Sequence, residues 1–138
     1  MTKRRVVITG LGAVTPCGIG TDNFWNAMLE GKSGVSTIER IDTEKQSVKI
    51  AAEIKDCDFN PEDYIDPKDA KKMDRYTQFA VVAADEAIAD SGIDDVEIDP
   101  YRIGVIVSSA AGGFHTFEKS HMAMIEKGPT KASPFTVP

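Results

Sequence analysis

The chain has 138 residues, about one ordinary domain, and its 41% hydrophobic and 28% charged residues favour a folded protein over a disordered one. Its formal net charge of −6 argues against general nucleic-acid binding, because phosphate binding requires a net basic face. No apolar run approaches the roughly 20 residues of a membrane span or follows the basic start as a signal peptide would. We therefore expect a cytoplasmic protein, and two cysteines, Cys17 and Cys57, fit a reducing compartment.

The first half of the chain predicts two strands and one helix. Residues 4–9 carry three consecutive β-branched side chains before a glycine, which is typical of a short buried strand. A glycine-rich loop over residues 10–20 leads into a helix that Thr21 or Asp22 can cap and that ends at the glycines that follow. The remaining segments are a weaker strand and an acidic irregular stretch, over residues 48–54 and 56–67.

The second half of the chain predicts three helices and one strand. A short helix is expected over residues 68–75 and a longer one over residues 77–90, closed by Ser91 and Gly92. The longer helix is apolar on nearly all sides, so we expect it to be mostly buried. A buried strand, a small-residue loop, a helix and an extended tail follow, over residues 103–107, 108–113, 114–127 and 128–138.

The alternation of strands and helices predicts the α/β class with a mainly parallel sheet. The two apolar strands would be central strands that are covered on both faces. Apart from the short one, three helices are a thin supply of cover for such a sheet, and the tail carries apolar residues with no element after it. We therefore expect residues 1–138 to be part of one domain, with no second domain present.

The run Gly10-Leu11-Gly12 after a predicted strand resembles the start of a dinucleotide-binding loop. That motif needs a helix N-terminus directly after the glycines to receive the pyrophosphate. Here a proline and further loop residues intervene before the helix, and no third glycine has the required spacing. The pattern therefore favours a tight turn beside a close-packed strand.

Small residues fill the loop from Ser108 to Gly113, between a predicted strand and a predicted helix. Such side chains leave room and expose backbone N–H groups, and ligands in open α/β sheets bind where strands end. An ordinary strand-to-helix turn would have the same composition. The spacing alone leaves both interpretations open.

Four basic residues recur at helical spacing and would form a stripe on one face, namely Lys68, Lys71, Lys72 and Arg75. On a protein of net charge −6, this stripe could steer an acidic partner. Aspartates interleave with the stripe, so the pattern alone favours an ordinary solvated face.

The histidines and cysteines show no arranged catalytic or metal site. His115 and His121 are six residues apart, a spacing that does not bring two ligands together on a helix. Cys17 has no neighbouring base, and Cys57 lies between two aspartates that would raise the pKa of its thiol. No cofactor is indicated, and the residues alone do not specify a reaction.

Motifs spread over the whole chain in a fixed order resemble the β-ketoacyl-acyl-carrier-protein synthase II family of elongating condensing enzymes. The opening run is Lys3-Arg4-Arg5-Val6-Val7-Ile8-Thr9-Gly10-Leu11-Gly12. It is followed by Thr15-Pro16, Gly18, Lys72-Met73-Asp74-Arg75, Asp90-Ser91-Gly92, Arg102-Ile103-Gly104, Ser109, Gly112-Gly113, Gly128-Pro129, Ser133-Pro134-Phe135 and Val137-Pro138. The resemblance covers the full chain and about a third of the family's length.

The resemblance implies the N-terminal part of a thiolase-like αβαβα fold, in an enzyme that works as a homodimer. It implies decarboxylative Claisen condensation of malonyl-carrier protein with an acyl group held on a cysteine, with two histidines stabilising negative charge. In the family, that cysteine lies in a Thr-Ala-Cys segment downstream of the Val-Pro. Neither the cysteine nor the two histidines are present here. The chain alone is therefore expected to be inactive, either as a fragment or as a partner-binding piece.

The resemblance also assigns roles to residues that are present. It places Ala111, Phe135 and Thr136 in the lining of the acyl pocket, where Ala111 and Thr136 are smaller than the residues often found in the family. It reverses the interpretation of the basic stripe, because Lys68, Lys71 and Lys72, with Lys131, resemble the docking surface for acidic acyl carrier protein. Thr130 stands where a basic residue is common. A polyketide-type ketosynthase or its chain-length partner shares these motifs and stays an alternative.

Overall fold

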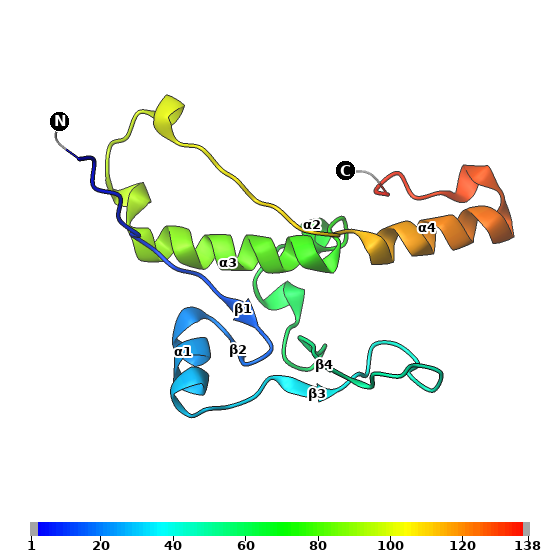
Figure 1. The fold of residues 1–138 in the computed structure, drawn as a ribbon. Helices are drawn as coiled ribbons and strands as arrows, with labels where there is room; N and C mark the ends of the chain where they lie inside the picture. The colour runs from blue at the N-terminus through cyan, green and yellow to red at the C-terminus, as the bar shows by residue number, and fades with distance from the viewer. Residues whose placement is uncertain (1–2, 137–138) are drawn as a thin grey trace.

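In the computed structural model, the described residues are 3–136, and they form four α-helices and four short strands (Figure 1). The helices are α1 (Thr21–Leu29), α2 (Pro67–Ala70), α3 (Arg75–Ser91) and α4 (Phe114–Lys127). The strands are β1 (Val14–Thr15), β2 (Gly18–Ile19), β3 (Val35–Thr37) and β4 (Ile50–Ala52). Val137 and Pro138, which contribute to the sequence resemblance, lie outside the described residues.

The three longer helices confirm the sequence predictions, because each has clear end signals. Helix α3 ends where Gly92 adopts the left-handed conformation with φ of 63°, which only glycine adopts readily. Helix α2 is shorter than expected, since it ends at Ala70 and a turn separates it from α3. None of the described helices combines the length and hydrophobicity needed to cross a bilayer.

The glycine-rich segment after residue 9 packs directly on the backbone of α3. A Cβ atom at Gly10 would lie 2.1 Å from the carbonyl oxygen of Ala87, and one at Gly12 would lie 1.8 Å from that of Ala83. Both distances are far below any tolerated contact, so only glycine fits at these two positions. Close packing at Gly10 and Gly12 is therefore present as predicted, but it is made with helix α3 and not beside a strand.

Two carboxylates of α3 hold the same segment by hydrogen bonds. Asp90 accepts from the backbone N–H of Leu11 at 2.9 Å, and Glu86 accepts from those of Ala13 at 2.9 Å and Thr21 at 2.6 Å. The hydrogen bond from the Thr21 N–H makes the largest contribution to lowering the pKa of Glu86. Burial opposes this shift, and the bond from the Ala13 N–H lowers the pKa further. Helix α3 thus fixes the β1–β2 hairpin and the start of α1 together.

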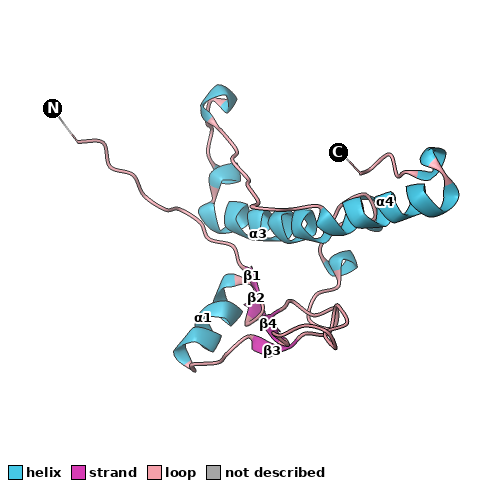
Figure 2. Ribbon diagram, turned by 45° about the vertical axis from the view of Figure 1, so that its right-hand side comes forward, coloured by secondary structure: helices cyan, strands magenta, loops and turns pink. Residues whose placement is uncertain are grey.

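The expected parallel sheet is not formed among residues 3–136. The strands pair as two small antiparallel sheets, β1 with β2 and β3 with β4 (Figure 2). Residues 4–9 and 103–107 have extended backbones but no strand partner, and they are exposed, with Val6 94% and Ile106 96% accessible. The prediction of two central buried strands was therefore wrong for this chain, because a β-branched run becomes a strand only when neighbouring strands accept its hydrogen bonds.

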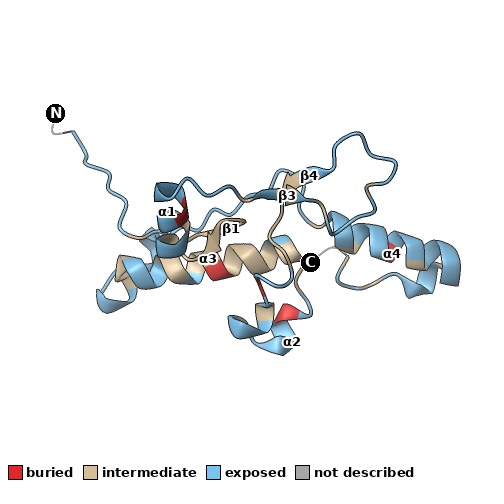
Figure 3. Cartoon of the chain, turned by 90° about the horizontal axis from the view of Figure 1, so that it is seen from below, coloured by how far each residue is buried: buried red, intermediate tan, exposed pale blue. Residues whose placement is uncertain are grey.

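The buried core is small and scattered (Figure 3). Phe59 is its largest member at 1% accessibility, stacked on Tyr64 and in edge contact with Phe79 at a centroid distance of 4.9 Å. On α3, which we expected to be mostly buried, only Val82 is fully buried. Most apolar positions of α3 are half-buried, whereas the large apolar side chains of residues 4–9 and 103–107 are exposed.

Candidate functional site

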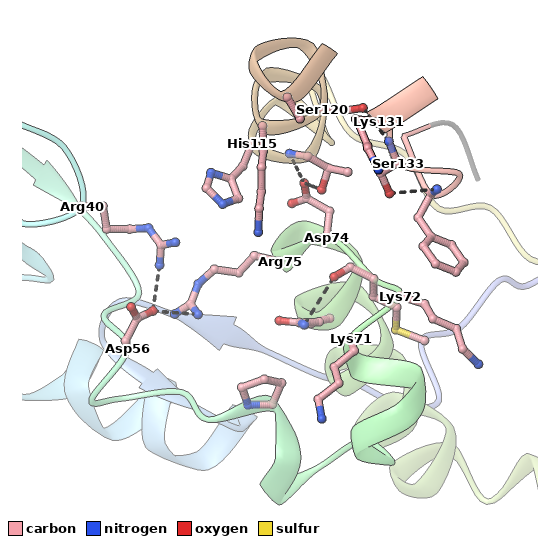
Figure 4. A pocket seen from close by; sticks show the side chains of 17 residues that line it. Arg40, Asp56, Lys71, Lys72, Asp74, Arg75, His115, Ser120, Lys131 and Ser133 are labelled. Carbon is pink, nitrogen blue, oxygen red and sulfur yellow. Dashed lines mark hydrogen bonds and ion pairs between the residues drawn. The ribbon is translucent and has the colours of Figure 1, made fainter. Parts of the chain in front are cut away.

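A basic cavity of about 620 Å³ opens between the turn after α2, the start of α3, α4 and the 3-10 helix η4 (Pro129–Lys131) (Figure 4). Its lining includes two acidic side chains, Asp56 and Asp74. The basic side chains that line it are Arg40, Lys71, Lys72, Arg75, Lys119 and Lys131. A concentration of positive charge on a chain of net charge −6 favours anionic groups at this cavity.

The predicted docking residues gather at this cavity with one exception. Lys71, Lys72 and Lys131 line it, whereas Lys68 is exposed on α2 but is not part of the lining. The stripe is not a face of one continuous helix, as the spacing predicted, since α2 ends at Ala70 and Arg75 begins α3. The turn between the two helices, not helical periodicity, brings Lys71 and Lys72 to the cavity edge.

Arg75 lines the cavity, but its charge is engaged by other residues of the chain. Its guanidinium pairs with Asp56 at 2.9 Å and donates to the carbonyl oxygen of Ile54 at 3.0 Å. It also lies 5.5 Å and 5.0 Å from the ring centroids of Phe59 and Phe79. The prediction that Arg75 belongs to a solvated basic face was therefore wrong, because its side chain packs against two aromatic rings.

One carboxylate joins the starts of α3 and α4. Asp74 Oδ2 accepts from the backbone N–H of Thr116 at 3.1 Å and from its hydroxyl at 2.6 Å. Partial burial opposes ionisation of Asp74, but these bonds and the N–H groups of Tyr76 and Arg75 outweigh it and hold its pKa below the usual value. This link fixes the two walls of the cavity to each other.

A buried hydroxyl on α4 holds the segment that follows it. Ser120 is 5% accessible, and its Oγ accepts from the backbone N–H of Ser133 at 3.0 Å. The hydroxyl groups of Thr136 and Ser120 lie 2.6 Å apart and form a further hydrogen bond. The segment with Lys131, Phe135 and Thr136 is therefore anchored to α4 through one side chain.

Two of the three predicted acyl-pocket residues come together. Phe135 and Thr136 line a second cavity of about 100 Å³, which also includes Tyr76 and Gly113. Ala111 is exposed and does not line this cavity. The neighbouring Gly112 lies so close to Tyr76 that an added Cβ would be 2.7 Å from its ring. The loop is thus seated on the start of α3.

Sequence patterns gave no signal for several residues of the cavity. Asp74 and Ser120 act through contacts with residues 42 and 13 positions away, which periodicity does not show. Arg40 joins the cavity from an irregular loop, where it pairs with Asp56 at 2.9 Å. The spacing of His115 and Lys119, four residues apart on α4, was the only usable hint, since both line the cavity.

The two histidines have different surroundings. His121 stacks with Phe117 at a centroid distance of 6.1 Å, whereas His115 lies at the cavity. Both cysteines are free thiols. Within residues 3–136, no group of three or more potential ligand side chains is arranged to hold a metal ion.

Comparison with known proteins identifies the family. The model of the family described as "Beta-ketoacyl synthase, N-terminal domain" matches residues 3–138. The chain belongs to this β-ketoacyl synthase family. The family resemblance inferred from the sequence motifs is thereby confirmed, and so is the α/β class as the N-terminal part of a thiolase-like fold.

Two curated relatives of this β-ketoacyl synthase chain carry the name 3-oxoacyl-[acyl-carrier-protein] synthase 2. The protein of Staphylococcus aureus (strain COL) is 49% identical over 136 residues, which are 99% of this chain and 32% of that protein. The protein of Vibrio harveyi is 43% identical over 138 residues, which are 100% of this chain and 33% of that protein. The chain therefore spans about a third of the length of the curated relatives it matches.

Two solved structures share the fold. A type II polyketide acyl-carrier protein in complex with its ketosynthase contains a chain that superposes with a TM-score of 0.71 at 25% identity, covering 96% of this chain and 34% of that one. The ishigamide ketosynthase/chain length factor superposes with a TM-score of 0.68 at 27% identity, covering 98% of this chain and 33% of that one.

Proposed function

We propose that the protein carrying this β-ketoacyl synthase chain is a 3-oxoacyl-[acyl-carrier-protein] synthase of the elongating type. It is an acyltransferase that condenses malonyl-carrier protein with an acyl group in fatty acid elongation. The observation that carries the proposal is the 43 to 49% identity to relatives of that name across nearly the whole chain. Motifs that this family shares are present from Lys3 onward.

In the condensation, an acyl group moves from carrier protein to a cysteine thiolate, and malonyl-carrier protein then loses carbon dioxide. The resulting carbanion attacks the acyl thioester and expels the thiolate, so the product is a 3-oxoacyl-carrier protein two carbons longer. The matching cysteine and two histidines are absent from the 138 residues of this chain. The chain by itself is therefore inactive under this proposal.

The basic cavity supports the docking part of the proposal. Lys71, Lys72 and Lys131 line it, and Lys68 lies exposed beside it on α2. Charged side chains at the rim of an interface raise the association rate with a partner of opposite charge. We assign these four lysines to the docking of acidic acyl carrier protein, the partner that the names of the relatives include.

Phe135, Thr136 and Ala111 are assigned to the lining of the acyl pocket. Phe135 and Thr136 share the second cavity, which begins directly beside the docking cavity because Phe135 lines both. An acyl chain delivered at the docking surface would therefore have a short path to this lining. Ala111 does not line this cavity, so it would join the acyl pocket only through contacts with protein outside these 138 residues.

The remaining assignments follow from the family and the charge. We propose a cytoplasmic homodimer that needs no cofactor and binds neither nucleic acid nor membrane. The net charge of −6 is unfavourable for binding nucleic acid. Residues 1–138 are assigned to the N-terminal part of the N-terminal thiolase-like domain.

A polyketide-type ketosynthase, or its chain-length partner, is the second candidate. The observation that favours it is the superposition with two polyketide-type structures. Their identities of 25 and 27% are well below the 49% shared with the fatty acid synthase relative. Fatty acid elongation is therefore the better supported of the two.

The test is a condensation assay on the full-length protein, with the 138-residue chain as the matched control. With acyl-carrier protein and malonyl-carrier protein, we expect the full-length protein to release one carbon dioxide for each 3-oxoacyl product. We expect no turnover from the 138-residue chain. A full-length protein that forms only products of repeated condensation would favour the polyketide candidate, and one without condensation would contradict the proposal.

A further inference from the structure

Helix α4 presents a lysine to the basic cavity from the side opposite α2. One face of α4 contributes to the lining, through His115, Thr116, Lys119, Ser120 and Ala123. These positions recur every three to four residues, as expected for a single helix face. Lys119 is the one member of this face that carries a permanent positive charge, and its side chain is exposed.

The charge of Lys119 is not neutralised inside the described part of the chain. Arg40 and Arg75 share Asp56, and Lys72 pairs with Asp69 at 2.8 Å. Within residues 3–136, no ion pair involves the three other lysines of the cavity, Lys71, Lys119 and Lys131.

The helix itself offers Lys119 no partner either. The positions three and four residues before and after it hold His115, Thr116, Met122 and Ala123, none of which is a carboxylate. Both acidic side chains of the cavity are already engaged, Asp56 by two arginines and Asp74 by Thr116. Lys119 therefore faces the cavity as an unneutralised cation.

The wall that carries Lys119 is held in place at two points. Near its start, Thr116 bonds to Asp74 of the α3 N-terminus, and near its middle, Ser120 bonds to Ser133 of the following segment. The backbone that carries Lys119 is therefore fixed relative to the docking lysines of the opposite wall. Binding an anion between the walls then avoids the cost of ordering this backbone.

We propose that Lys119 is an additional docking residue, which binds carboxylates of the acidic carrier protein from α4 while Lys71 and Lys72 bind them from the α2 side. The inference rests on the proposed carrier-protein function and extends its docking surface to a helix that the sequence did not assign to it. An acidic helix seated over the cavity would then be held from two sides. The two-sided arrangement fixes the orientation of the partner as well as attracting it.

The experiment measures the affinity of the full-length protein for acyl carrier protein at low and high salt, with charge-reversal variants. Lys119→Glu is the test variant, and Lys71→Glu reports on the docking surface already proposed. Lys127→Glu is the matched control, because Lys127 lies on the same helix, does not line the cavity and also has no carboxylate three or four residues away. Thermal unfolding verifies that all variants stay folded.

We expect Lys119→Glu to weaken carrier-protein binding about three- to tenfold at low salt, mainly through a slower association rate. The effect should shrink at high salt, and Lys127→Glu should change affinity less than about twofold. A carrier-protein variant with an acidic helix residue changed to lysine should recover part of the affinity lost in Lys119→Glu.

The outcomes distinguish the docking role of Lys119 from the proposed function. If Lys71→Glu weakens binding but Lys119→Glu behaves like Lys127→Glu, the additional docking residue is refuted while the proposed function stands. If the unmodified protein does not bind carrier protein at all, the proposed function falls and this inference falls with it.

Discussion

A glycine-rich region of this chain is packed on α3, whereas two β-branched extended segments are exposed. The segment over residues 10–21 is packed on α3 through glycines and through the carboxylates of Glu86 and Asp90. Residues 4–9 and 103–107 are more β-prone, yet they are exposed and unpaired in the described structure.

The difference teaches that hydrogen-bond partners, and not β-propensity, decide which segment is fixed. The backbone N–H groups of Leu11, Ala13 and Thr21 find side-chain carboxylates on α3. Val6 and Ile106 stand in segments whose partners would be other strands. We propose that these partner strands belong to the other two thirds of the full-length protein, which would have the length of its relatives.

Gly12→Ala should have the largest effect of any single change here. Its Cβ would lie 1.8 Å from the carbonyl oxygen of Ala83, so the segment must leave α3. We expect a loss of at least about 3 kcal/mol in the free energy of unfolding. Urea denaturation followed by the fluorescence of Trp25 on α1 measures it.

The matched control is Gly104→Ala, in the unpaired segment. A Cβ at Gly104 would meet nothing within 4 Å, so we expect a change below about 0.5 kcal/mol. Equal destabilisation by the two substitutions would remove the proposed distinction between the packed and the unpaired region.

Glu86→Gln should have the next largest effect. It removes the charge that accepts hydrogen bonds from Ala13 and Thr21, and we expect a loss of about 1 to 2 kcal/mol in the free energy of unfolding. Asp85→Asn, one residue away and exposed, is the control and should be nearly neutral. A Glu86→Gln variant as stable as the control would show that the hairpin is held by packing alone.

The contribution of Glu86 should also depend on pH in a defined direction. Its pKa is lower in the folded chain than its ordinary value of 4.5, chiefly because of the Thr21 N–H. Its stabilisation is therefore fully present above the unfolded pKa and is lost as the pH falls through the folded pKa. We expect the difference between the original protein and Glu86→Gln to shrink below about pH 4 in urea denaturation series, and a difference that grows toward acid would contradict this sign.

Asp74→Asn should have a smaller effect, on the cavity more than on global stability. It weakens the bonds that join α4 to α3, and we expect a loss of about 1 kcal/mol in the free energy of unfolding. Carrier-protein affinity of the full-length variant should fall although no docking charge has been removed. Asp63→Asn, outside the cavity, is the control. Equal carrier-protein affinity of the two variants would show that the link between Asp74 and Thr116 does not contribute to docking.

Ile106→Thr should change the stability of the 138-residue chain least. The side chain is 96% exposed, so we expect a shift within about 0.5 kcal/mol. The same substitution should reduce self-association of the chain, because exposed apolar extended segments pair with one another. Sedimentation velocity at several concentrations measures this, and an unchanged distribution would show that residues 103–107 do not drive association.

The helices could be predicted from the sequence because their signals are local. Gly92 closes α3 in the left-handed conformation, and the apolar spacing of α4 gave its bounds, Phe114–Lys127, correctly. The sheet could not be predicted in the same way, since pairing depends on strands that need not be near in sequence. Residues 103–107 carry every local sign of a strand and still have no partner here.

The candidate site was predicted in part for the same reason. Lys71, Lys72 and Lys131 came from the family resemblance, and the fold brings them to one cavity. Arg75 lines the same cavity, but its ion pair with Asp56 and its two aromatic partners were not visible in the spacing. Lys119 was missed because only the tertiary link between Asp74 and Thr116 sets α4 opposite α2.

Hydrogen exchange, compared between the 138-residue chain and the full-length protein, tests the central distinction most directly. We expect backbone amides of α3 and of residues 13–21 to be protected in both proteins, because their partners lie within this chain. Amides of residues 4–9 and 103–107 should exchange freely in the 138-residue chain and slow by at least about a hundredfold in the full-length protein. Protection of these two segments in the chain alone, or their free exchange in the full-length protein, would contradict the account.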